Sequence, residues 1–409
     1  MKKGDQYYAL GEYYDAAAEY KAAYSKTPTK LRDKRGERAI KMADCYRKIN
    51  YTAKAIGSYQ NGIRYTEKAM ADRKKAAEAA AKEKKTKKAT AKKEPAQEAR
   101  SASKRSRKAP DNSDAQVSAL DTQLSPEDSL AEATILESTL LLARLQQKSG
   151  DYKNAIKNYE RYLEDSKTLY ALYPTICTPQ NDTLAMNGLI GSRQAAVMKQ
   201  KPTLHTVKKE PSLNSRRSDF SPALFGDDWD QLYWTTTRPQ ATGDDLSGIT
   251  GTKYADIFWS KKDDKGKWSA PEKVEGDLNT PLDEGACCFT PDGKAMYLTY
   301  CAADPDYPRY AQIYTSNRSD ASWSKPQLVK ISKDTLSCFA HPAISPDGEW
   351  LYFVSDMPGG RGGKDIWRIA ISGSNIIGGA ENLGAPINTP GDEMFPTFRF
   401  NGDLYFSSD

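Results

Sequence analysis

The sequence contains few of the residues that build metal and catalytic centres, and it has no long apolar run. Its 409 residues include two histidines and six cysteines, with no Cys-x-x-Cys pair and no His-x-x-x-His partner, so the ligand spacing typical of zinc sites is absent. No stretch approaches the roughly 18 consecutive apolar residues that a membrane-crossing helix requires. Neither a membrane span nor a signal peptide is therefore predicted in the sequence as given.

Motifs of familiar catalytic chemistry are also missing. No Gly-x-Ser-x-Gly elbow with a later histidine, the arrangement that serine hydrolases use, follows the repeats of the C-terminal half. The glycine-rich run that ends at Gly363 and Lys364 has Asp365 where a phosphate loop needs Ser or Thr. Cys287 and Cys288 fall in a predicted strand, where packed thiols are expected. We predict that the chain is not an enzyme and has no catalytic, metal-binding or cofactor-binding residues.

Charge is concentrated in one segment. The hydrophobic fraction of 38% and the mean hydropathy of −0.75 are low for a folded chain, which indicates that a solvated segment dilutes the rest. Residues 68–110 contain 16 Lys and Arg against 5 Asp and Glu, whereas the whole chain has a net charge of +6. The remaining residues are acidic on balance, so the basic character does not belong to the folded surfaces.

Residues 68–121 are predicted to form an insert rich in Lys and Ala. Their composition favours a helix, but they have almost no side chain larger than Ala that could hold a helix on a core. We expect a frayed helix that passes into a disordered loop near Pro95 and Pro110. Such a segment is either simply solvated or binds a polyanion by counterion release. It lacks aromatic residues on which bases could stack, so nucleic acid is not predicted as a partner.

Three copies of a small-and-aromatic pattern flank this insert, two in residues 1–67 and one in residues 122–198. The aligned positions are Gly11, Tyr13, Ala16, Tyr20, Ala23 and Pro28 in the first copy, Asn50, Thr52, Ala55, Tyr59 and Gly62 in the second, and Gly150, Tyr152, Ala155, Tyr159 and Tyr162 in the third. Residues with this spacing share one face of a helix. The pattern predicts repeated antiparallel helix pairs, and a plain helical bundle is the alternative.

A further helix is predicted at about 183–198, with Asn181 and Asp182 as its N-cap. We expect it to cap the helical repeats with one face that needs no neighbour. Residues 199–217 are polar and basic with two prolines, which is typical of an interdomain linker.

Residues 218–409 change to short aromatic and β-branched runs that recur at a fixed distance. The turn and strand at 289–298 reappear at 344–353, a shift of 55, and again at 400–406, with a divergent copy at 232–234. The turn Ser345-Pro346-Asp347-Gly348 should fold one strand back on the next. Each unit is predicted to be a four-stranded antiparallel propeller blade. Three blades and the start of a fourth are expected, and a ring this short would leave a strand edge uncovered.

Both halves resemble known repeat families. The helical pattern resembles the tetratricopeptide repeat, and the β pattern resembles the WD40-like PD40 propeller repeat, most specifically in the runs at 355–367 and 388–396. Together they resemble a group that joins these repeats to a C-terminal OmpA-like peptidoglycan-binding domain and includes a component of the type IX secretion system. The resemblance implies a multidomain, periplasmic, outer-membrane-associated scaffold that binds other envelope proteins. Peptidoglycan binding would belong to the OmpA-like domain, which this sequence does not contain.

Candidate partner-binding residues follow from the helical repeats, because the inner helix of each repeat faces a concave groove. These candidates are Asp5, Tyr8, Asp44, Arg47, Arg144, Gln147 and Lys148. The alternative functions are a propeller that senses a small ligand or a glycan through its central channel, and a regulatory cap on an enzyme domain outside this sequence.

Overall fold

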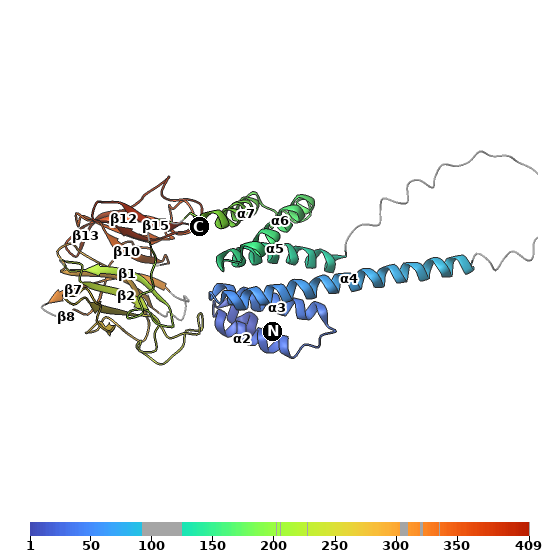
Figure 1. Cartoon of the computed structure of the whole chain (residues 1–409), viewed down its shortest axis with the longest axis horizontal. Helices are drawn as coiled ribbons and strands as arrows, with labels where there is room; N and C mark the ends of the chain where they lie inside the picture. The colour runs from blue at the N-terminus through green and yellow to red at the C-terminus, as the bar shows by residue number, and fades with distance from the viewer. Residues whose placement is uncertain are drawn as a thin grey trace, which may run out of the picture. The chain divides into compact units, whose positions relative to one another are not determined.

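The computed structural model describes residues 1–91, 125–201, 203–204, 206–226, 228–302, 310–319, 322–334 and 336–408. Its internal contacts separate two compact units, Met1–His205 and Thr206–Asp409. The first unit is helical and the second consists of antiparallel sheets, as Figure 1 shows. The predicted order of a helical region followed by a β region is confirmed.

The first unit is a succession of helices in which each packs on the one before it. The helices are α1 (Lys2–Ala9), α2 (Tyr13–Ser25), α3 (Arg32–Lys48), α4 (Thr52–Ala91), α5 (Pro126–Lys148), α6 (Tyr152–Leu169) and α7 (Pro179–Lys199). Short turns join α1 to α2, α3 to α4 and α5 to α6, so each pair is an antiparallel hairpin.

The three hairpins turn at aligned residues. Gly11, Asn50 and Gly150 have φ angles of 77°, 59° and 81°, the left-handed conformation that ends a helix and that Gly and Asn tolerate best. The backbone N–H of each donates to a carbonyl three residues earlier, at 3.0–3.1 Å. The sequence repeat therefore corresponds to a repeat of local structure.

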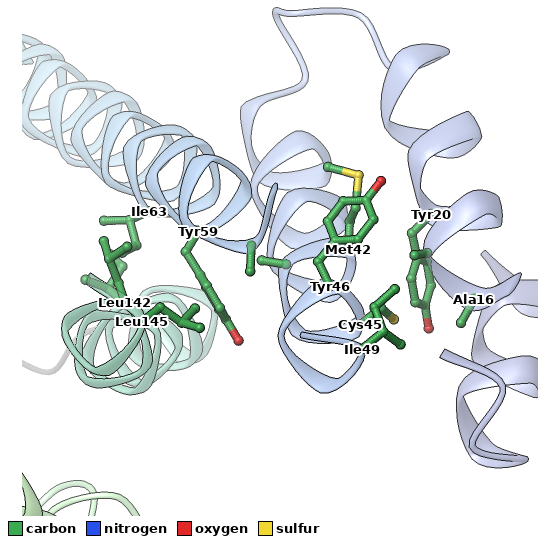
Figure 2. Packing of buried hydrophobic residues seen from close by; sticks show 14 residues of the cluster. Ala16, Tyr20, Met42, Cys45, Tyr46, Ile49, Tyr59, Ile63, Leu142 and Leu145 are labelled. Carbon is green, nitrogen blue, oxygen red and sulfur yellow. The ribbon is translucent and has the colours of Figure 1, made fainter. Parts of the chain in front are cut away.

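The core of the helical unit is built from the small and aromatic positions of the repeat. Ala16 and Tyr20 are buried on α2, and Tyr59 holds the same place on α4 as Tyr20 does on α2. In Figure 2, Tyr20 lies beside Cys45 of α3, and Leu145 of α5 belongs to the same cluster. One continuous core therefore joins the first two hairpins to α5.

Helix α4 continues past the residue at which the sequence insert begins. It is helical to Ala91, and the side chains described from Lys74 onward are exposed. The remainder of the predicted insert, 92–121, lies outside the described residues. The part of the insert that is described is thus one continuous helix that leaves the core.

The start of α7 differs from the prediction. Thr178 is its N-cap, with Oγ1 accepting from the backbone N–H of Asn181 at 3.1 Å, and Pro179 is its first residue. The predicted N-cap at Asn181 and Asp182 is wrong, because a capping hydroxyl followed by proline starts the helix earlier. Asp182 instead accepts a hydrogen bond from Ser166 of α6 at 2.8 Å.

The outer face of α7 is also not polar. Met186, Ile190 and Val197 are exposed by 46%, 45% and 54%, and at 100° per residue they lie on one side of the helix. The expectation of a terminal face that needs no neighbour does not describe this helix, because three large apolar side chains lie in solvent there.

The described residues of the second unit form four sheets in chain order. Its strands are β1 (Asp219–Phe225), β2 (Gln231–Thr236), β3 (Asp256–Lys261), β4 (Glu272–Lys273), β5 (Asp283–Phe289), β6 (Ala295–Ala302), β7 (Tyr310–Ser319), β8 (Ser322–Trp323), β9 (Gln327–Leu328), β10 (Phe339–Ile344), β11 (Trp350–Ser355), β12 (Asp365–Ser372), β13 (Asn375–Asn382), β14 (Glu393–Phe398) and β15 (Leu404–Ser408). The sheets run β1-β2-β3-β4, β5-β6-β7-β8 with β9 also on β7, β10-β11-β12-β13, and β14-β15. All of these pairings are antiparallel.

The predicted turn chemistry is confirmed. Between β10 and β11 the N–H of Gly348 donates to the carbonyl of Ser345 at 2.8 Å, and Gly348 has a φ of 75°. Between β5 and β6, Gly293 donates in the same way to Thr290 at 2.9 Å. Glycine closes both turns because the exit position requires a positive φ.

Apolar layers lie between successive sheets. Met296 and Leu298 of β6 pack with Ile257 of β3, and Tyr297 on the opposite face of β6 packs with Phe353 of β11. Alternate residues of β6 thus serve two different cores, as the period of two in a strand requires. Each inner sheet is sandwiched between its neighbours along the chain.

Part of the predicted linker 199–217 belongs to the second unit. Leu213 is buried against Trp234 and Phe258, and its carbonyl accepts from Nη2 of Arg238 at 2.9 Å. The chain is therefore fastened to the first sheet before β1 begins.

Candidate functional sites in the helical repeats and at the inner strands

The predicted groove residues lie on the first helix of each hairpin, but most are used to hold the repeats together. Asp5 accepts from the Tyr20 hydroxyl at 2.8 Å, and Asp44 accepts from Tyr59 at a longer 3.4 Å. These two aspartates hold the same place in the repeat, six residues before Gly11 and Asn50. A buried tyrosine that pairs with an acceptor on the first helix is therefore a repeated element.

In the third hairpin the acceptor for the tyrosine hydroxyl is a different residue. Arg144 occupies the position of the two aspartates, and a guanidinium cannot accept a hydrogen bond. The Tyr159 hydroxyl donates instead to Oε1 of Gln147, one turn later, at 2.6 Å. Arg144 is exposed, and its guanidinium takes no part in the tyrosine bond of this hairpin.

Tyr8, Asp44 and Arg47 form one network between the first two hairpins. The Tyr8 hydroxyl donates to Oδ2 of Asp44 at 2.6 Å, and Nε of Arg47 donates to Oδ1 at 2.9 Å. Burial, with a smaller contribution from the Asp44 charge, raises the pKa of Tyr8 above its usual range. The hydroxyl remains a donor at all ordinary pH values, so this contact is structural in the free chain.

Two further predicted residues also bridge helices. Asp5 accepts from Lys41 at 2.8 Å, and that bond is the main cause that lowers the pKa of Asp5. Lys148 donates to Oδ1 of Asn50 at 2.8 Å, which links α5 to the turn of the second hairpin. The sequence repeat marked Tyr20, Tyr59 and Tyr159 as aligned positions, but it did not predict that their hydroxyls bond to the first helix of each hairpin.

In the β unit, a motif that recurs in the sequence joins one sheet to the next. Asn279 accepts from the N–H of Ile257 at 2.8 Å and donates to the carbonyl of the same residue at 3.0 Å. Asn388 does the same with Ile366, at 2.8 and 2.9 Å. Each asparagine therefore clamps the third strand of one sheet to the segment that enters the next.

A buried glutamate completes each clamp. Glu284 accepts from the backbone N–H of Thr280 at 2.9 Å, and Glu393 accepts from that of Thr389 at 2.9 Å. Burial raises the pKa of Glu284 to about 8. The sheet that begins at β10 has Phe339 in this position and packs it into an apolar core, so its junction relies on hydrophobic contact.

The first strand of every sheet contains the same irregularity. Ser221, Ala286, His341 and Phe395 have positive φ angles of 50°, 45°, 51° and 55°, and the strand register shifts at each of them. Positive φ is uncommon for such residues and marks a bulge held by its surroundings. All four residues line one cavity of about 1260 Å³.

The bulges of the second, third and fourth sheets are each held by a hydrogen bond to the preceding sheet. The N–H of Ala286 donates to Thr235 at 2.9 Å, and that of His341 donates to Thr299 at 3.0 Å. The equivalent residue of β11 is Val354, which offers no side-chain acceptor. There the N–H of Phe395 donates to Nδ1 of His341 at 3.4 Å, and the two rings stack with centroids 3.9 Å apart.

Two titratable groups of the cavity wall are neutral, although Asp230 and Arg318 also line the cavity. Burial lowers the pKa of His341 to about 4, and because Nδ1 accepts a hydrogen bond, the ring proton is assigned to Nε2. Burial raises the pKa of Cys287 to about 12, so that thiol stays protonated and is a poor nucleophile. Pro222, Pro342 and Pro396 follow three of the four bulges and remove backbone donors from these edge strands.

The described parts of the chain contain no group of three or more His, Cys, Asp or Glu arranged to hold a metal ion. Among the same residues, no helix combines the length and apolar character needed to cross a bilayer.

No protein family and no curated protein matches the chain. Similar solved structures include a puromycin-hydrolysing peptidase of Mycobacterium tuberculosis, with 16% identity, a TM-score of 0.27 and coverage of 44% of this chain and 24% of the peptidase. This chain thus spans about a quarter of the peptidase.

Two glycosidases are also similar. The α-L-arabinofuranosidase of Lactobacillus brevis has 13% identity and a TM-score of 0.32, covering 46% of this chain and 65% of that enzyme. A thermostable family-43 glycoside hydrolase has 11% identity and a TM-score of 0.24, covering 48% and 85%. All three are hydrolases, which contradicts the prediction that this chain is not an enzyme. TM-scores this low supply no argument for a particular activity, so the comparison leaves the chain similar in part to hydrolases.

Proposed function

We propose that the chain is a protein-interaction scaffold of the bacterial envelope, made of tetratricopeptide-type hairpins followed by PD40-type propeller blades. The proposal extends the sequence resemblance to the peptidoglycan-associated component of the type IX secretion system, PorE. The observation that carries it is that each kind of repeat has its own recurring feature. Each hairpin has a buried tyrosine bonded to its first helix, and each sheet has a bulged first strand. Repeats of this kind build extended surfaces suited to protein partners.

The blade assignment rests on how the sheets succeed one another. Each sheet is antiparallel, each starts at a bulged strand, and those four strands line a common cavity. In a propeller the first strand of every blade is the innermost one, and the sheets pack face to face around the centre. The order of the sheets and of their cores along the chain agrees with this arrangement.

The helical unit is the part for which partner contact is proposed most specifically. Arg144 is exposed on α5, while the other groove candidates are hydrogen-bonded to side chains of this unit. A cationic side chain on a surface where the other polar candidates are already hydrogen-bonded is suited to binding an acidic segment of an envelope protein.

The test is co-purification of cross-linked partners from envelope fractions with the intact chain and two charge-reversed variants. Arg144→Glu should lose the captured proteins, whereas Lys157→Glu, on the second helix of the same hairpin, should retain them. Circular dichroism of both variants reports whether the helices are intact. Retention of every partner by a folded Arg144→Glu variant would contradict the assignment of α5.

A second candidate function, sensing of a small ligand or glycan, is favoured by the cavity at the inner strands. Its wall includes the stacked His341 and Phe395 and the exposed Trp229, and aromatic faces bind apolar sides of small molecules. Titration of glycan fragments followed by tryptophan fluorescence should give a saturable change that Phe395→Ala weakens. No change with any fragment would remove this candidate.

A further inference from the structure

The part of α4 that extends beyond the helical core has a fixed base. Arg73 donates through Nε to Asp128 of α5 at 2.7 Å and through Nη1 to Asp33 of α3. Asp72 pairs with Arg32, and Ala69 is buried. The helix is therefore held to two neighbours up to residue 73, and from there to Ala91 it extends about 27 Å at 1.5 Å per residue.

Beyond this base the sequence of the helix offers no large apolar side chain that could pack in a protein core. The side chains described at 74–83 are all exposed, and residues 74–91 contain no apolar residue larger than Ala. Its helicity follows from Ala, Lys and Glu and from Glu-to-Lys spacings of four residues, as between Glu78 and Lys82. This segment, residues 74–91, is called the basic arm below.

The lysines of the basic arm are not evenly distributed around the helix. At 100° per residue, six of its seven lysines lie within one half of the circumference. These six are Lys74, Lys75, Lys82, Lys84, Lys85 and Lys88. Glu78 falls in the same half, which keeps a net charge of +5, and the positions of the other half are mainly Ala and Thr, with Glu83 and Lys87. The arm therefore presents one cationic side along a straight rod.

We infer that the basic arm binds the surface of an anionic phospholipid bilayer. A rod with one cationic side matches a flat layer of negative headgroups, and each Lys near such a surface adds about 1 kcal/mol of attraction. The absence of large apolar residues means that the arm lies on the headgroups and does not insert. All of its cations are Lys, and it has neither the Arg nor the aromatic residues that favour nucleic acid.

The experiment uses the whole chain and vesicles of phosphatidylcholine with or without about one third phosphatidylglycerol. Co-sedimentation should show at least about tenfold stronger binding to the anionic vesicles, and this binding should fall steeply between about 50 and about 300 mM salt. Replacing Lys74, Lys75, Lys85 and Lys88 together with Gln should reduce binding at least about tenfold. Gln keeps the helix propensity, and circular dichroism reports that the helix is intact.

A matched control removes the same charge elsewhere. Replacing the exposed Lys265, Lys267, Lys325 and Lys333 of the β unit with Gln should leave vesicle binding unchanged. Equal losses in the two variants, or equal binding to neutral vesicles, would overturn the proposal. So would a single-stranded oligonucleotide that binds the chain more tightly than anionic vesicles do at the same salt, because the polyanion would then be a nucleic acid. None of these results depends on the scaffold function.

Discussion

Glu284 shows how one buried side chain makes the β unit sensitive to pH. Its side chain is 1% exposed and accepts two hydrogen bonds from Thr280, yet burial outweighs those bonds and raises its pKa to about 8 from the ordinary 4.5. The folded state thus holds a proton that the unfolded state releases at lower pH. The stability that the neutral carboxyl contributes is complete below pH 4.5 and is lost as the pH rises towards about 8.

We therefore predict that the free energy of unfolding of the β unit falls between pH 5 and pH 8, by up to roughly 1.4 kcal/mol per pH unit. Glu284→Gln removes the titrating proton and should flatten this dependence. Urea unfolding followed by tryptophan fluorescence at several pH values measures it. Glu275→Gln, at an exposed position, is the control and should keep the slope. An unchanged slope in Glu284→Gln would show that another group is responsible.

Thr299 illustrates a second residue-scale effect, the support of a strained backbone. Its hydroxyl is the acceptor for the N–H of His341, which has a φ of 51°. Thr299→Val keeps the shape of the side chain but leaves this amide without its partner, which should cost about 1–3 kcal/mol. Thr299→Ser should recover part of the loss. Equal stability of the Val and Ser variants in urea unfolding would show that the hydroxyl does not support the bulge.

At the scale of elements, the asparagine clamps decide how one sheet is joined to the next. Asn388 is 2% exposed, makes two bonds to the backbone of Ile366 and also donates to Oδ1 of Asn382 at 2.9 Å, so truncation would leave the two buried backbone groups of Ile366 unpaired. We predict that Asn388→Ala costs about 2–4 kcal/mol. Urea unfolding measures the loss, and Asn375→Ala, at an exposed position of β13, should cost less than about 0.5 kcal/mol. Similar effects of the two variants would contradict the clamp.

The helices of each hairpin are also joined by a recurring side-chain hydrogen bond, which here comes from a tyrosine hydroxyl. The three hairpins place a tyrosine hydroxyl against the first helix of the same pair, and the acceptor changes from Asp to Gln where Arg144 enters. The position of the tyrosine is thus more constant than the identity of its partner. The residue at the Asp position of a repeat can therefore change, as Arg144 shows, as long as another hydrogen-bond acceptor for the tyrosine lies within one helical turn.

At the scale of the whole molecule, the two compact units can be followed separately. All seven tryptophans lie in the β unit, from Trp229 to Trp367, whereas the helical signal comes from the first unit. We predict that Tyr159→Phe, which removes the bond to Gln147, shifts the helical transition by about 1 kcal/mol and leaves the tryptophan transition unchanged. Asn388→Ala should do the reverse. If both probes shift together in either variant, the units unfold as one.

Much of this architecture could be predicted from the order of residues. The recurrence of Ala and Tyr at 16, 20, 55 and 59 predicted helical hairpins, and the turn at 345–348 predicted strands that fold back on each other. Both are local: helical spacing and turn chemistry act over a few residues, so the chain reveals them without knowledge of its fold. The start of α7 was missed because Thr178 and Pro179 outweigh the Asn and Asp that follow.

The candidate sites were less predictable, for a physical reason. Asp44 and Arg47 read as free groove residues, but Tyr8, from another hairpin, lies within hydrogen-bond distance of Asp44. In the same way, the sequence marked Asn388 only as the start of the run at 388–396, and its bond to Ile366 is formed across the fold. The sequence by itself determined the repeats and the charge of the basic arm. Only the tertiary structure decided which polar groups stay on the surface, because that depends on partners distant in the chain whose burial fixes both their bonds and their pKa values.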